Sequence, residues 1–129
     1  MKQGQCIQAY KALSKIMMQD TSLPISKKVF DLHEKLRPIW DFQVNEETKI
    51  AARHPDVDPV SASVRYPTND KEAEKKALAE LEAFEKDIHD LSEMEPAIKT
   101  EPFTIYMDQE NLRISGNDIK ALTGLINFE

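Results

Sequence analysis

The sequence predicts a predominantly helical α+β domain. Two long segments, residues 25–53 and 69–95, repeat apolar residues every three or four positions, as one face of an α-helix does. Alternation of apolar and polar residues, which is typical of a strand with one buried face, is limited to short stretches near 60–66 and 103–114. Only three glycines occur in 129 residues, which fits long helices with few tight turns. We expect one domain, residues 1–129, in which the two long helices form an antiparallel hairpin.

The first helix is expected over residues 5–19 and should lie across the two long helices. Its apolar residues, from Cys6 to Met17, recur at helical spacing. Cys6 is the only cysteine, so no internal disulfide forms and a reducing compartment is indicated. No histidine or second cysteine is near it in sequence, and we interpret it as a small apolar core residue.

The second helix should begin after Ser22 as its N-cap. Pro24 then lies in the first turn, where a missing N–H costs nothing. Pro38 falls inside the helical pattern and removes one backbone hydrogen bond, so we expect a kink or a break near Arg37. The helix should resume and end by His54.

The third helix is the clearest element. Asn69 followed by Glu72 predicts a capping box, and Pro96 should end the helix near Glu95. Before it, the composition predicts a loop and then a short strand over Val60–Tyr66. The apolar stripe of the helix comprises Ala77, Leu81, Phe84, Ile88 and Leu91.

Two further strands and a last helix are expected after Pro96. Phe103–Met107 and Leu112–Ile114 alternate, and the residues between them suit a turn, so we predict a small antiparallel hairpin. Ser115 should cap a C-terminal helix with Asp118 in the box position. The hairpin and this helix should cover one end of the helical pair. The buried stripe of the last helix should be Ile119, Leu122, Leu125 and Ile126.

Charge is unevenly distributed along the chain. The net charge is −6; residues 1–55 carry nine basic and six acidic side chains, and residues 69–95 carry four basic and ten acidic ones. The basic half could pack against the acidic helix, or the acidic face could bind a basic partner. Nucleic-acid binding is disfavoured because it needs clustered Lys and Arg. No apolar run is long enough to span a membrane, and residues 1–20 are too polar for a signal peptide.

No standard catalytic or metal-binding motif is present. The chain lacks a P-loop, GxGxxG, HExxH and CxxC, and no nucleophile elbow frames a serine. His33, His54 and His89 lie far apart, without a second ligand at helical spacing. Asp56–Asp58 suits a turn better than a calcium loop, because the glycine and terminal glutamate of such a loop are absent. We therefore expect no enzyme activity, no catalytic residues, no metal and no cofactor.

Four residues are candidates for a binding surface: Trp40, Arg53, Arg65 and Tyr66. Aromatic and arginine side chains are favoured anchors at interfaces. Trp40 lies beside the expected kink, and Arg65 and Tyr66 lie in the expected strand. The alternative is that Trp40, with Phe42, is simply core around the kink.

Four segments resemble a small uncharacterised family of proteins from tailed phages and prophages of Gram-positive bacteria. They are QAYKALSKIM (8–17), LPISKKVFDLHEKL (23–36), AFEKDIHDLSEME (83–95) and LRISGNDIKALTGLINF (112–128), in the family's order. The resemblance implies a phage-encoded protein of the host bacterial cytoplasm and carries no active site to this chain.

Three hypotheses of function follow. The first is a non-enzymatic binding protein that acts on a host, defence or virion-assembly protein. The second is a protein that sequesters a small nucleotide signal and so counters host immunity, with Arg53, Arg65 and Tyr66 converging on one pocket. The third is a small hydrolase. Surplus apolar residues and heptad-like spacing are also compatible with a homodimer, although the oligomeric state cannot be read from the sequence.

Overall fold

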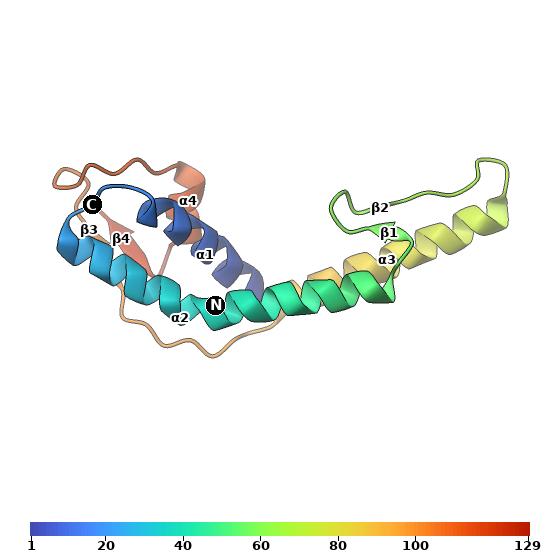
Figure 1. Ribbon diagram of the computed structural model, residues 1–129, viewed down its shortest axis with the longest axis horizontal. Coiled ribbons are helices and arrows are strands. Elements are labelled where there is room, and N and C mark those ends of the chain that lie inside the picture. The colour runs from blue at the N-terminus through green and yellow to red at the C-terminus, as the bar shows by residue number, and fades with distance from the viewer.

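The computed structural model describes residues 1–129 and shows an elongated molecule with two parts (Figure 1). We call residues 1–40 and 96–129 the body, and residues 41–95 the arm. Helix α2 runs through both parts, and the predicted α+β class, predominantly helical, is confirmed. The elements in order are α1 Gln3–Met17, α2 Leu23–Arg53, β1 Val57–Asp58, β2 Ser63–Val64, α3 Lys71–Glu93, β3 Phe103–Ile105, α4 Gly116–Ala121 and β4 Ile126–Phe128.

The core of the body forms between α1, the first half of α2 and the C-terminal elements. Cys6 is fully buried, as predicted, and Leu13 and Leu36 have no exposed surface either. Each buried Leu or Ile contributes about 1.5–3 kcal/mol. The thirteen core residues are Cys6, Ala9, Ala12, Leu13, Ile16, Val29, Leu32, Leu36, Ile105, Leu112, Leu122, Leu125 and Ile126.

Helix α2 continues through Pro38, so the break considered near Arg37 does not occur. The helix changes direction near its middle, as a helix with an internal proline does (Figure 1). Gln3 is 1% exposed; its Nε2 donates to the Ile39 carbonyl at 3.0 Å and to Gln43 Oε1 at 3.1 Å. These bonds attach α1 to α2 just beyond the proline.

The arm is an antiparallel pair made by the second half of α2 and by α3. The predicted pairing therefore covers only half of α2, because α1 packs along the other half (Figure 1). The buried core of the arm is small: Ile50, Val57, Phe84 and Leu91, with Leu81 and Ile88 half-buried beside them.

Helix α3 is capped one position later than predicted. The Asp70 carboxylate, not the Asn69 side chain, accepts the backbone N–H groups of Glu72 and Ala73 at 3.1 and 3.0 Å. A carboxylate here also interacts favourably with the helix dipole. The capping box assigned to Asn69 is therefore wrong, although the end of the helix ahead of Pro96 is as predicted.

Strands β1 and β2 pair as a short antiparallel hairpin. This differs from the single strand predicted over Val60–Tyr66. The Asp58 carboxylate accepts the N–H groups of Val60 and Ser61 at 2.9 and 3.3 Å, which turns the chain between the strands. Val60 therefore lies in the turn and is 95% exposed.

Strand β3 pairs with β4, and the two strands are parallel. The antiparallel hairpin predicted from Phe103–Met107 and Leu112–Ile114 is therefore wrong. Parallel strands need a long crossover, and residues 106–125, which include α4, provide it here. Leu112 is buried in the core without belonging to a strand. The alternation indicated burial correctly but not the strand partner.

Helix α4 is shorter than predicted. Ser115 caps it as expected, its Oγ accepting the Asp118 N–H at 3.1 Å. The chain then turns at Gly124, whose φ of +87° lies in the left-handed region that glycine adopts readily. The predicted stripe is buried at three of its four positions, Leu122, Leu125 and Ile126. The fourth residue, Ile119, is 39% exposed.

Candidate functional site

Trp40 lies at the interface of α1 and α2. Its ring stacks on Tyr10 with centroids 4.7 Å apart, and Tyr10 stacks on His33 with centroids 4.1 Å apart. The three rings form a column that joins the two helices. Trp40 is half-buried and lies outside the core cluster, and Phe42 is 39% exposed. The alternative interpretation of Trp40 and Phe42 as core residues around the kink is therefore wrong for Phe42.

Arg53, Arg65 and Tyr66 lie on the arm. Thirteen positions of α2 separate Trp40 from Arg53, about 20 Å at the helical rise. Arg53 Nη1 is 3.8 Å from Asp87 Oδ2, and Arg65 and Tyr66 follow β2 on the surface. A hollow at the hairpin includes Arg65 but neither Arg53 nor Tyr66. The structure does not bring the four predicted residues together.

His54, at the end of α2, forms a cluster that the sequence analysis missed. Its Nδ1 is 2.9 Å from Glu80 Oε1, and its Nε2 is 2.9 Å from Asp87 Oδ2. Carboxylates only accept hydrogen bonds, so both ring nitrogens donate and the imidazole is protonated. The bonds to Asp87 and Glu80 raise the pKa of His54, and the bond from His54 lowers the pKa of Asp87. The cluster joins α2 to α3, and the His54 ring packs nearly perpendicular to the Phe84 ring, with centroids 6.0 Å apart.

Ser14 and His33 have the spacing of a nucleophile and a base, with Oγ 3.0 Å from Nε2. Ser14 Oγ also donates to the Tyr10 carbonyl within α1. Burial lowers the pKa of His33, and its Nδ1 has no hydrogen-bond partner. The N–H groups around Ser14 are engaged in the helix, so none is available to an oxyanion. The pair is best described as a packing contact of the body.

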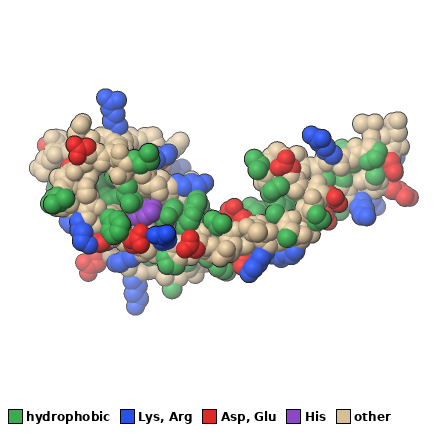
Figure 2. Space-filling model, in the orientation of Figure 1, with side chains coloured by type: hydrophobic (Ala, Val, Ile, Leu, Met, Phe, Trp, Pro, Cys, Tyr) green, Lys and Arg blue, Asp and Glu red, His purple; other side chains and the backbone are tan.

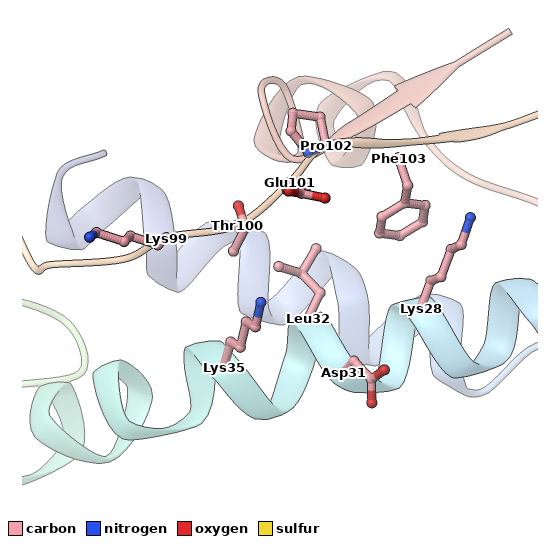
Figure 3. Close-up of a pocket in the computed structure, with 9 residues that line it drawn as sticks. All are labelled: Lys28, Asp31, Leu32, Lys35, Lys99, Thr100, Glu101, Pro102 and Phe103. Atoms are coloured by element: carbon pink, nitrogen blue, oxygen red, sulfur yellow. The ribbon is translucent and has the colours of Figure 1, made fainter.

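A hollow of about 690 Å³ lies between α2 and the segment that returns from α3 to β3. We call it the groove. Ligand pockets commonly have volumes of about 300–1,000 Å³. Figure 3 shows its two walls, one helical and one extended. The residues that line it are Lys28, Asp31, Leu32, Lys35, Lys99, Thr100, Glu101, Pro102 and Phe103.

The groove carries unpaired positive charge. Asp31 is already paired with Lys27, whose Nζ lies 2.6 Å from Oδ1. Glu101, on the extended wall, is the other acidic residue of the lining. The lining therefore carries three lysines and one carboxylate that form no ion pair, in a chain whose net charge is −6. The three lysines of the lining, none of which has a carboxylate oxygen within 4 Å, are Lys28, Lys35 and Lys99.

The groove also has an apolar part. Leu32 is 5% exposed and belongs to the body core, and Phe103 packs against that core. The Lys28 ammonium lies 5.7 Å from the centroid of the Phe103 ring, at cation–π distance. In Figure 3 Leu32 and Phe103 point into the space between the walls. The groove can therefore hold a ligand that is both anionic and apolar.

Only part of the groove had a signal in the sequence. Lys28 and Lys35 are seven residues apart, which is two helical turns, so they share a face. Lys99 and Phe103 come from a distant segment, and no local pattern links them to α2. Because the segment was expected only as a connection to a hairpin, the sequence analysis missed the groove.

The charge asymmetry of the chain is met in part by contacts between its segments. Lys2 pairs with Glu93, Arg53 approaches Asp87, and His54 bonds to α3. Figure 2 shows acidic and basic side chains side by side on this face of both parts. The acidic helix is therefore partly neutralised by the basic half of the chain.

No group of three or more His, Cys, Asp or Glu side chains is placed to hold a metal ion. No helix has both the length and the apolar character that crossing a membrane requires. Among known proteins, no family model, curated protein or solved structure matches this chain.

Proposed function

We propose that this chain is a non-enzymatic binding protein whose groove holds an acidic segment of a partner protein. The observation that carries the proposal is the set of unpaired lysines around an apolar floor. Carboxylates of the partner pair with the lysines, and its apolar side chains cover Leu32 and Phe103. Each exposed pair contributes only about 0.2–1 kcal/mol, so several pairs and the apolar contact act together.

The biological setting follows from the resemblance to phage proteins. The chain acts inside an infected bacterium, and the partner is a host, defence or virion-assembly protein. Neither catalysis nor a cofactor is part of this proposal.

A small nucleotide is the second candidate, because Phe103 and the lysines could hold a base and phosphates. One observation favours the peptide. The Lys28 ammonium already lies over the Phe103 ring, where a stacked base would have to displace it. Thermal unfolding with ATP, GTP or a cyclic dinucleotide should show no stabilisation; a rise in Tm that grows with nucleotide concentration would favour the second candidate.

Fluorescence anisotropy tests the first candidate. The probe is a labelled eight-residue peptide of alternating Glu and Val, compared with one of alternating Lys and Val. We expect the chain to bind the acidic peptide, and more weakly as salt rises. The double variant Lys28→Glu/Lys35→Glu should bind about tenfold more weakly or worse, a loss of about 1.4 kcal/mol.

A matched control has the same change in net charge. Lys11 and Lys76 are exposed on α1 and α3 and do not line the groove. The variant Lys11→Glu/Lys76→Glu should bind like the unaltered chain. Equal losses in both double variants, or no binding of the acidic peptide by the unaltered chain, would contradict the proposal.

A further inference from the structure

The extended wall of the groove has unused backbone hydrogen-bonding groups. No backbone N–H or C=O group of residues 95–102 forms a hydrogen bond within the chain. Pro96 and Pro102 bound five consecutive residues, 97–101, that keep their N–H groups. Backbone groups are strong donors and acceptors that are nearly always paired or solvated. These five residues can therefore pair with another chain.

The same residues already have the side-chain pattern of a strand. Ile98 packs against the body core and Thr100 is half-buried, whereas Ala97, Lys99 and Glu101 are exposed. This alternation has the period of two that extended chain produces.

The stretch continues directly into β3. Strand β3 belongs to a sheet of two strands, so β4 pairs with only one of its edges. Charged residues on an exposed edge discourage uncontrolled pairing between copies. Lys99 and Glu101 are placed to discourage pairing between copies of this chain. The edge is therefore suited to a partner strand whose charges are complementary to its own.

We infer that the acidic segment binds as an added β-strand beside residues 97–101. The inference rests on the proposed function and specifies its mode. In strand addition the backbone bonds supply affinity and alternate side chains supply specificity. Side chains that face the floor contact Leu32, and those that face outward meet the ammonium groups of Lys28 and Lys35, whereas the Lys99 side chain points away from this space (Figure 3).

The spacing of two lysines on α2 suits an extended partner. Lys28 and Lys35 lie about 10 Å apart along α2 at the helical rise, which three residues of extended chain cover at about 3.3 Å each.

N-methylation of the peptide tests the inference without altering the protein. Each residue of the Glu–Val peptide is N-methylated in turn, which removes one backbone donor and keeps the side chain. A strand that pairs along one edge uses alternate N–H groups, so affinity should fall at every second position. The expected loss is about three- to tenfold at those positions and little at the others.

The outcomes separate the mode from the function. If the parent peptide binds and methylation has no effect with a period of two, strand addition is wrong and the binding function stands. If the parent peptide does not bind, the proposed function fails and the inference fails with it. Loss at alternate positions, together with loss in Lys28→Glu/Lys35→Glu, supports both.

Discussion

The body and the arm share α2 but are stabilised in different ways. The body has a core of thirteen buried apolar residues, and the arm has four. The arm compensates with polar contacts, above all those of His54 with Glu80 and Asp87. Segments with few buried contacts open locally at lower cost than a large core. We therefore expect the arm to open while the body stays folded.

This difference bears on the groove, which lies in the body. Its extended wall is anchored at both ends: the Met94 carbonyl accepts the Gln3 N–H at 2.6 Å, and β3 pairs with β4. Near the first anchor, α1 and α3 are closely packed, since a Cβ on Gly4 would lie 3.3 Å from Ser92 Cβ. A surface held in this way loses little freedom on binding, which favours affinity.

The largest effect is expected from the body core. Leu36 is fully buried, and Leu36→Ala should lower the free energy of unfolding by about 3–5 kcal/mol. Denaturant unfolding measures this loss of stability. As denaturant unfolds the variant, peptide binding should be lost together with the fold. The matched control is Leu78→Ala, because Leu78 is 47% exposed and its truncation should cost about 0.5 kcal/mol or less. Similar costs for both variants would contradict the assignment of the core.

A somewhat smaller and local effect is expected in the arm. Phe84 is 4% exposed and belongs to the small cluster, so Phe84→Ala should cost the arm about 3 kcal/mol. Hydrogen exchange should accelerate in α3 and remain slow in α1, and the acidic peptide should still bind. Simultaneous acceleration in both helices would show that body and arm unfold as one unit.

The third effect depends on pH. Because the pKa of His54 is raised, its stabilisation of the arm is full below about pH 6.5 and is lost as pH rises through the raised value. Because the pKa of Asp87 is lowered, its stabilisation is lost only as pH falls through that lowered value. After correction for the intrinsic pH dependence of exchange, α3 should lose protection as pH rises above about 6.5 through the raised pKa of His54.

Two variants isolate the His54 contribution. In His54→Gln this loss of protection should be absent, and in His89→Gln, at an exposed position of α3, it should persist. A pH response that is the same in His54→Gln and in the unaltered chain would contradict the role given to His54.

The smallest effect is at the start of α3. Asp70→Ala removes the acceptor for two N–H groups and should cost about 1 kcal/mol. Asn69→Ala should change stability by no more than about 0.5 kcal/mol. Hydrogen exchange in the first turn of α3 distinguishes the two variants. A larger loss of protection in Asn69→Ala than in Asp70→Ala would support the Asn69 cap that was predicted from the sequence.

Periodicity predicted the helices because it reports burial on one face. The apolar stripe from Leu81 to Leu91 and the buried Cys6 follow directly from spacing. The same logic indicated that Leu112 is buried, but strand pairing depends on distant partners. This is why β4, rather than residues 112–114, pairs with β3.

The candidate site was largely beyond local reasoning. The groove joins α2 to a segment far along the chain, and the His54 cluster joins side chains 26 and 33 positions apart. Trp40 was selected for its residue type, and its stacking on Tyr10 depends on how α1 packs. The spacing of Lys28 and Lys35 places them on one face of α2, but the sequence analysis did not select them, and nothing local indicated that Lys99 completes the set.

The central claim is that the body binds an acidic strand and the arm does not. Hydrogen exchange, measured on the free chain and on the peptide-saturated chain, tests this claim most directly. We predict that amides 97–101 exchange rapidly in the free chain, since they lack partners, and become protected with the Glu–Val peptide, while α3 is unchanged. Protection confined to the arm, or none at residues 97–101 at saturation, would contradict the account.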